Sequence, residues 1–181
     1  ASKRLAADAR LAPLALATLD RIAPNARLRG AVTGHVRAAG TARDLHLATT
    51  LRSSSGGGAI DLRGTVALRG SRTQYDLVAV TDSLDASAFT PRAPSTRLTG
   101  TLAARGRGAS PATANAELRA DLTGSRVDTL AIDRLSTRLA VAEGVARVDT
   151  LAIVASGARV DAGGTLGLVA GKVGTLRFAA A

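Results

Sequence analysis

The chain contains no cysteine and only two histidines, His35 and His46. The absence of cysteine excludes disulfides, thiolate catalysis and metal sites with cysteine ligands. Two histidines do not make a zinc site without the help of carboxylate ligands. We therefore expect neither a metal site nor a bound cofactor.

Aromatic residues are also scarce, at 2% of the chain, and comprise Tyr75, Phe89 and Phe178, whereas 46% of the residues are hydrophobic. Compact globular cores usually depend on aromatic side chains for much of their buried area. The apolar surface must therefore be made of alanine, leucine and valine. No run approaches the roughly 20 apolar residues of a membrane-spanning helix. We expect the chain to be an internal piece of a longer protein, with any export signal or anchor upstream.

The basic residues are strongly biased towards arginine. The formal net charge is +10, and Lys3 and Lys172 are the only lysines among 24 basic residues. The simplest interpretation is a solvated face, and the functional ones are contacts with anionic lipid headgroups or with nucleic acid. Nucleic-acid binding also needs stacking surfaces, which three aromatic residues do not supply. We therefore expect no nucleic-acid partner.

The first segment of the chain shows a helical period. Apolar residues recur at three- and four-residue steps between Leu5 and Leu19, which predicts a helix within residues 3–22. Pro13 would kink this helix or restrict it to a start near residue 12. Pro24 would end it.

From Leu28 onward the apolar period is two. Ile60 and Leu62, for example, alternate with Asp61 and Arg63. Strict alternation predicts strands with one apolar and one polar face, and the short breaks between them predict an antiparallel meander. The expected strands are 28–37, 44–52, 58–69, 74–81, 97–107, 114–123, 130–141, 145–154, 158–169 and 173–180.

Glycines lie inside these strands on the apolar parity, which indicates bends, bulges or close approaches of the backbone. Residues 55–68 match residues 156–168 in their pattern, which indicates two variations on one hairpin-rich unit. We therefore divide the chain into three parts. They are a helical or linker segment at 1–25, a first β-hairpin-rich unit at 26–92, and a second unit of the same continuous sheet at 93–181.

No segment carries the chemistry of an enzyme. The loop at residues 53–58 is rich in serine and glycine, but a strand follows it and it lacks a lysine, so it predicts a hairpin loop and not a phosphate cradle. Asp82 and Asp85 are close in sequence, yet no base partner accompanies them, so we interpret them as residues of a solvated turn. We expect a protein without catalytic residues.

Three blocks of sequence together resemble one protein family. The first is Leu-x-Gly-x-Val-x-Gly-x-Val at residues 28–36, followed by Gly-Thr-Ala-Arg-Asp-Leu-His-Leu at 40–47. The others are Gly-Ala-Ile-Asp-Leu-Arg-Gly-Thr-Val-Ala-Leu at 58–68 and Leu-Thr-Gly-Thr-Leu at 98–102. They are similar to the repeated strands of AsmA-like proteins, particularly the TamB (translocation and assembly module) branch, over residues 11–181.

The resemblance implies an all-β fold, in which an elongated, curved antiparallel sheet forms a U-shaped trough (a β-taco) with one short N-terminal helical segment. It also implies a periplasmic location, in a parent protein anchored in the inner membrane of a Gram-negative-type bacterium. The implied partners are phospholipid acyl chains and an outer-membrane assembly protein of the same system. The implied function is phospholipid transport and outer-membrane protein assembly or secretion between the two membranes.

The expected lipid groove is the apolar inner face of this trough. Its lining is expected to be Leu28, Val32, Leu45, Leu47, Ile60, Leu62, Val66, Leu68, Leu98, Leu118, Leu122, Leu139, Val141, Leu166 and Leu168. The alternative is a structural or adhesive extracellular β-protein, similar to an autotransporter passenger, whose interior is filled by its own side chains. A continuous apolar groove open to solvent would favour the first interpretation.

Overall fold

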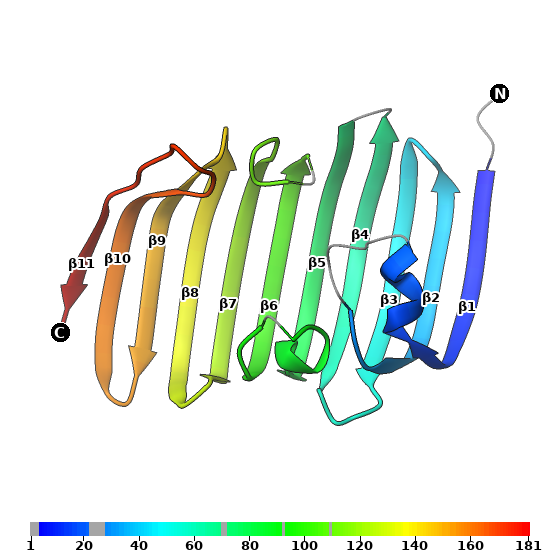
Figure 1. Cartoon of the computed structure of the whole chain (residues 1–181), viewed down its shortest axis with the longest axis horizontal. Helices are drawn as coiled ribbons and strands as arrows, with labels where there is room; N and C mark the ends of the chain where they lie inside the picture. Colours follow the sequence, from blue (N-terminus) through cyan, green and yellow to red (C-terminus); the bar gives the residue numbers. More distant parts are fainter. Residues whose placement is uncertain (1–3, 22–27, 70–71, 92, 109) are drawn as a thin grey trace.

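The computed structural model describes residues 4–21, 28–69, 72–91, 93–108 and 110–181. Eleven strands form one open, curved antiparallel sheet and follow one another across it in chain order, so that the two ends of the chain lie at opposite ends of the sheet (Figure 1). The expected all-β antiparallel trough is thus confirmed. The strands are β1 (Arg4–Ala15), β2 (Ala31–Thr41), β3 (Asp44–Ser53), β4 (Ala59–Arg69), β5 (Arg72–Leu84), β6 (Thr96–Arg107), β7 (Asn115–Val127), β8 (Leu130–Ala142), β9 (Val145–Ala155), β10 (Ala158–Gly167) and β11 (Leu176–Ala180).

Two tight turns show why successive strands become neighbours. Glu143 and Gly144, between β8 and β9, have φ of +51° and +76°. Ser156 and Gly157, between β9 and β10, have φ of +50° and +81°. Two consecutive residues with positive φ give the turn whose twist matches that of a hairpin.

The helix predicted within residues 3–22 is largely wrong. Residues Arg4–Ala15 form β1, and only Leu16–Arg21 form a short 3-10 helix, η1. Leu5 and Leu11 face the same side at even spacing, and the alanines between them fit a strand as well as a helix. Pairing with β2 satisfies the backbone of β1, and Pro13 lies where the register shifts between Leu11 and Leu14.

The registers of the ten strand pairs place apolar residues in four rows that run across the sheet, perpendicular to the strands. Residues directly opposite each other in neighbouring strands share a face, so each row lies on one side of the sheet, which we call the inner face. Each row is named after its β4 residue. The Ile60 row is Leu11, Gly34, Leu51, Ile60, Thr81, Gly100, Leu122, Leu135, Ile153, Val160 and Ala180. The Leu62 row is Ala9, Val36, Thr49, Leu62, Ala79, Leu102, Ala120, Thr137, Leu151, Ala162 and Phe178. The Gly64 row is Ala7, Ala38, Leu47, Gly64, Leu77, Ala104, Leu118, Leu139, Val148, Gly164 and Leu176, and the Val66 row is Leu5, Gly40, Leu45, Val66, Tyr75, Gly106, Ala116, Val141, Ala146 and Leu166.

Two glycines in these rows show the close approach that the sequence indicates. Gly64 and Gly100 have φ of +151° and +147°, a region that side chains disfavour. A Cβ atom at Gly64 would lie 2.0 Å from the carbonyl oxygen of Asp76, and one at Gly100 would lie 2.1 Å from that of Asp121. Neighbouring backbone therefore occupies the space that any larger residue would need.

Two segments of the chain cover parts of the inner face. In Figure 1, η1 lies in front of β2 and β3 in the lower half of the sheet, and the connection between β5 and β6 lies at the lower margin of the sheet. We call η1, residues 28–30 and residues 85–91 the cap. At the upper margin, residues 168–175 fold back towards the turn between β8 and β9, where the amide of Leu168 donates to the carbonyl of Gly144 at 2.8 Å. Between these two segments the described residues leave the inner face uncovered (Figure 1).

Candidate functional site

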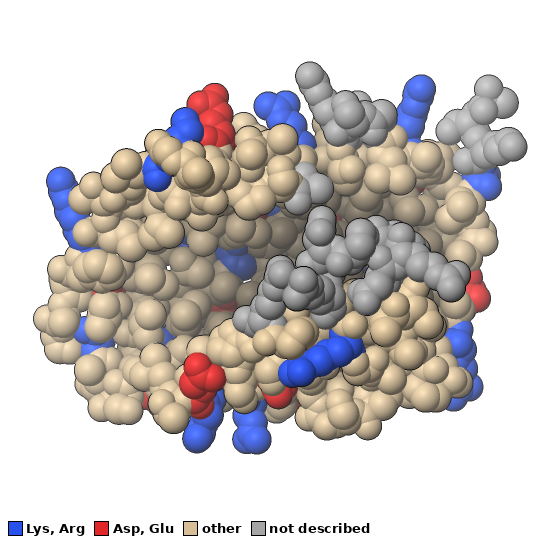
Figure 2. Space-filling model, in the orientation of Figure 1, with Lys and Arg blue, Asp and Glu red and all other residues tan. Residues whose placement is uncertain are grey.

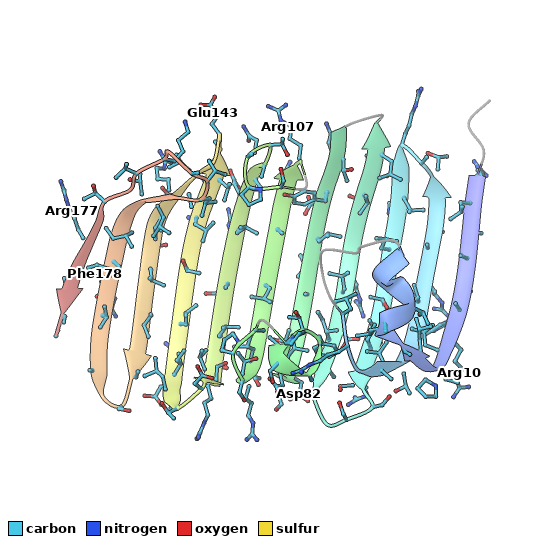
Figure 3. All side chains as sticks on the ribbon, viewed as in Figure 1. Arg10, Asp82, Arg107, Glu143, Arg177 and Phe178 are labelled. Carbon is cyan, nitrogen blue, oxygen red and sulfur yellow. The ribbon has the colours of Figure 1, made fainter. Side chains whose placement is uncertain are left out.

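The inner face is apolar from β1 to β11. Among the described residues of the four rows none is charged, and the only polar side chains are Thr49, Thr81, Thr137 and Tyr75. Figure 2 shows this side of the molecule as a hollow, with most of the charged atoms in view along its margins. Figure 3 likewise places Arg107 and Glu143 at the upper margin and Asp82 at the lower one. The candidate site is therefore this hollow face.

The hydroxyl groups of the three inner-face threonines donate hydrogen bonds to backbone carbonyls of the sheet. The hydroxyl of Thr49 donates to the carbonyl of His35 at 2.9 Å, and that of Thr137 donates to Thr150 at 3.0 Å. The hydroxyl of Thr81 donates to the carbonyl of Gly100 at 3.3 Å. Because each hydroxyl is bonded to backbone of its own or a neighbouring strand, the threonines leave the apolar character of the face unbroken.

Most of the lining residues predicted from the sequence lie in the four rows. Their side chains are half-buried or buried, apart from Leu166, which is 41% exposed. The rows bring together Leu45, Leu47, Ile60, Leu62, Val66, Leu118, Leu122, Leu139, Val141 and Leu166.

The other predicted lining residues lie beyond the rows. Val32, 3% exposed, is beneath the cap, and Leu98 lies opposite Leu84 near the lower margin. Leu68 is 50% exposed at the upper end of β4. Leu28 precedes β2, which begins only at Ala31, and Leu168 follows β10, which ends at Gly167. The strand bounds predicted around Leu28 and Leu168 are therefore wrong, because backbone of the cap and of the C-terminal segment takes over there.

Several inner-face residues were not predicted from the sequence. In β5, Leu77 and Ala79 face inward while Val78 and Val80, 44% and 51% exposed, face outward, so the run shows no alternation. In β9 the register shifts opposite Arg138 and Leu139, so Val148 and Leu151 both face inward although they are an odd number of positions apart. The apolar side chains of β1 were assigned to a helix.

The opposite side of the sheet, the outer face, carries the charges. Asp8 lies against the ring of His35 and the guanidinium of Arg37, whose hydrogen bonds lower the pKa of its carboxyl group below the ordinary value. Arg159 donates to Asp161 at 2.6 and 2.8 Å, which lowers the pKa of Asp161 and raises that of Arg159. These side chains are exposed, so their pairing contributes little to stability. Acids and arginines share this face, but in two cross-strand pairs arginine lies opposite arginine, namely Arg119 opposite Arg138 and Arg97 opposite Arg126.

Backbone hydrogen bonds join the segments of the cap to one another and to the loop between β3 and β4. The amide of Leu16 donates to Gly30, that of Arg29 to Phe89, and that of Asp85 to Gly57, at 2.9, 2.9 and 3.0 Å. The Asp85 carboxylate accepts from the backbone amides of Thr96 and Ser87, both at 3.0 Å. The amide of Thr96 is the main cause that lowers the pKa of Asp85. Asp85 is therefore the N-cap of η2 (Ala86–Ala88).

An apolar cavity of about 200 Å³ lies between the cap and the sheet. Leu16 and Phe89 contribute from the cap, and Leu51 and Ile60 of the Ile60 row contribute from the sheet. Val32, Leu84, Ser53 and Gly58 complete the lining. The cavity is thus continuous with the open rows of the inner face, and Leu16 and Phe89 are site residues that the alternation pattern did not reveal.

The inner face has the dimensions of a lipid-sized surface. The four rows span seven residues along a strand such as β4, from Ile60 to Val66, or about 20 Å for six steps of about 3.3 Å. The eleven strands span about 50 Å at about 4.8 Å per strand. One leaflet of a bilayer's hydrocarbon core is about 15 Å thick, so an extended acyl chain fits on this face either along or across the strands.

The other polar candidates from the sequence, His46 and Asp82, each contact a nearby polar side chain. His46 lies 3.6 Å from Asp44 on the outer face, and Asp82 accepts from the hydroxyl of Ser83 at 3.1 Å. In the part of the chain that the structure describes, no group of three or more histidine, aspartate or glutamate side chains is placed to hold a metal ion. No helix among the described residues has the length and hydropathy needed to cross a bilayer.

No protein-family model, no curated protein and no solved structure matches this chain. The resemblance to AsmA-like proteins is therefore a hypothesis.

Proposed function

We propose that the inner face is a hydrophobic groove that carries the acyl chains of phospholipids. By its resemblance to the TamB branch, the chain would be a segment of a periplasm-spanning protein, anchored in the inner membrane through other parts of its parent. Its role would be phospholipid transport, together with outer-membrane protein assembly or secretion, between the two membranes. The observation that supports this proposal best is that the four apolar rows run without a charged side chain across the sheet, on a face that is hollow in Figure 2.

The energetic argument begins with the cost of leaving such a face in water. Contiguous apolar patches larger than a few hundred Å² are rare on soluble monomers and usually mark an interaction site. Each methylene group kept out of water contributes about 0.8 kcal/mol. Acyl chains lying on the rows would bury their own methylene groups together with those of Leu62, Leu102 and Leu151.

The row geometry also suggests how lipid would move. Successive strands present similar aliphatic side chains at the same level, so a tail that steps from one strand to the next changes its apolar contacts little. The charged headgroup would stay in water at the margin. Movement along the groove would then need no catalytic residue, only a difference in lipid concentration or an energy source elsewhere in the parent protein.

The direct test is to purify the chain from bacterial membranes and identify co-purifying lipid by mass spectrometry. We expect phospholipid in stoichiometric amounts, and its loss in Leu62→Asp but not in the adjacent outer-face variant Arg63→Asp. A folded wild-type chain that carries no lipid, with its inner face covered instead by protein, would contradict the proposal and favour the structural or adhesive β-protein.

A further inference from the structure

The cavity beneath the cap differs from the rest of the inner face because the cap partly encloses it. Its volume is about 200 Å³, and among the described residues that line it Ser53 has the only polar side chain. The hydroxyl of Ser53 lies 3.1 Å from that of Ser55 and accepts from the Ser55 amide at 3.3 Å, so its hydrogen bonds are made within the loop. An apolar cavity of about 150 Å³ lined by aliphatic and aromatic groups binds a small hydrocarbon, and this partly open cavity has a comparable size and lining.

Close contacts join the parts of the cap to each other and to the loop between β3 and β4. Gly30 and Gly57 lie so close to Ala88 that a Cβ atom would lie 2.8 Å from its carbonyl oxygen and 2.6 Å from its side chain, respectively. The guanidinium of Arg29 donates to the carbonyl of Ser87, which ties the two parts of the cap together. A preformed site costs less ordering on binding than one assembled by its ligand.

We propose that this cavity holds the methyl end of one hydrocarbon chain, so that a bound lipid is oriented with its tail end under the cap and its headgroup towards the upper margin. This proposal deepens the proposed function and rests on it. The occupant is assigned from the almost wholly apolar lining, from the volume, which suits a group of on the order of six carbons, and from the continuity of Leu51 and Ile60 with the open rows.

The orientation is tested by methyl NMR on the whole chain with phospholipids that carry a nitroxide at one carbon of the acyl chain. A nitroxide near the methyl end should broaden the methyl signals of Ile60 and Leu84 more than those of Val66 and Val141. A nitroxide near the carboxyl end should reverse this order. Equal broadening by both lipids, or the opposite order, would overturn the proposal.

A second measurement tests the cavity without lipid, by titration with hexane followed on the same methyl signals. Ser53→Leu adds carbon atoms inside the cavity and should weaken hexane binding roughly tenfold, the effect of excluding about two methylene groups. Ser54→Leu makes the same chemical change at the neighbouring exposed residue and should leave binding unchanged. Leu84→Ala enlarges the cavity and should shift the preferred guest to a longer alkane, which keeps the test valid if Ser53→Leu fails to fold.

The outcomes separate this proposal from the proposed function. Lipid binding with random orientation refutes the tail-end site and leaves the groove standing. Hexane binding at Ile60 and Leu84 without lipid binding refutes the groove as a lipid carrier, and with it the assigned lipid orientation. The absence of hexane binding in the folded wild-type chain refutes the tail-end site directly.

Discussion

The lower margin of the sheet is built differently in β1–β6 and in β7–β11. In the first half, η1 and the connection between β5 and β6 fold over the inner face and bury Leu16 and Val32 to 8% and 3% exposure. In the second half, short turns at Asp128 and at Ser156–Gly157 reverse the chain without covering anything. The same ladder and the same rows run through both halves. The connections, and not the strands, therefore decide which part of the apolar face is enclosed and which part is open.

The largest difference between the halves should appear when an inner-face glycine is replaced. Gly64 lies in the middle of the first half and Gly164 is next to the last strand, and a Cβ atom would meet a carbonyl oxygen at 2.0 and 2.1 Å. We expect Gly64→Val to destabilise the chain by about 3 kcal/mol or more, because strain and overlap add. Gly164→Val should mainly detach β11.

Urea unfolding measures the first effect, and amide exchange in β11 the second. Gly171→Ala is the control, since φ is +82° there but no atom lies within 4 Å of the added Cβ. Equal destabilisation by all three variants would show that backbone strain alone, and not the close approach of strands, is responsible.

The next largest effect is expected when a charge is placed in either half of one row, which tests whether the groove is continuous between the halves. Leu62 and Leu151 lie in the same row, five strands apart. If the groove is continuous, Leu62→Asp and Leu151→Asp should each reduce bound lipid at least roughly tenfold, because an ionised carboxylate cannot be buried unpaired beneath acyl chains. Lipid content is measured by mass spectrometry, and circular dichroism and protease resistance establish that each variant is folded.

The control variants for this test lie outside the rows. Leu68→Asp, at the half-exposed upper end of β4, should have a smaller effect than Leu62→Asp. Arg63→Asp on the outer face should have none. If Leu62→Asp is folded and loads lipid normally, the groove hypothesis is wrong.

The two edges of the sheet offer a third comparison. β1 presents an edge of 12 residues and β11 one of only 5. Unpaired edges promote pairing with another copy, so we expect the isolated chain to oligomerise, mainly through β1. Ala7→Lys, which sets a charge in the inner row of β1, should lower the average mass in light scattering more than Ala180→Lys in β11. A monomeric wild-type chain at high concentration would contradict this expectation.

The smallest effect concerns pH and is confined to the cap. Hydrogen bonds from Thr96 and Ser87 hold the pKa of Asp85 below its ordinary value of 3.8. The stability that Asp85 contributes is therefore fully present above pH 3.8 and is lost as the pH falls through the lower, folded-state pKa. Below that pH, hydrogen exchange at the amides of Ser87 and Thr96 should accelerate, while exchange in β7 and β8 should not.

Asp85→Asn tests the assignment of this pH effect. An amide side chain keeps an oxygen that can accept from Thr96, but it has no charge to lose. The variant should exchange faster than the wild type at neutral pH and lack the acid-dependent step. A step that persists in Asp85→Asn would place the responsible group elsewhere.

The alternation of residues such as Ile60 and Leu62 predicted the sheet and its antiparallel order, and most of the lining residues named from it lie in the four rows, because side-chain period and burial coincide in a one-sided sheet. The helix predicted over β1 was wrong because alanine fits both periods, and only pairing with β2 decides between them. Thr49, Thr81 and Thr137 were not predicted as inner-face residues. Their hydroxyl groups fit an apolar face only because each donates a hydrogen bond to a backbone carbonyl of the neighbouring strand.

The alternation pattern could not predict the cap and its cavity, for a different reason. Leu16 and Phe89 are more than seventy residues apart in sequence, and no period links them. They come together because backbone hydrogen bonds such as that from Arg29 to Phe89 join two irregular segments. Contacts of this kind depend on loop geometry, which the sequence pattern of the strands does not contain.

The strictly sequential order of the strands makes the sheet a modular, nearly one-dimensional array. Each strand exchanges ladder hydrogen bonds only with the strands before and after it in the chain, so stability accumulates from nearest-neighbour terms, as in solenoid proteins. Duplication of one hairpin would lengthen the array by about 10 Å and keep both faces in phase. Length can therefore change in evolution without redesign of the cross-section, and a strand that emerges during synthesis already has its only required partner behind it.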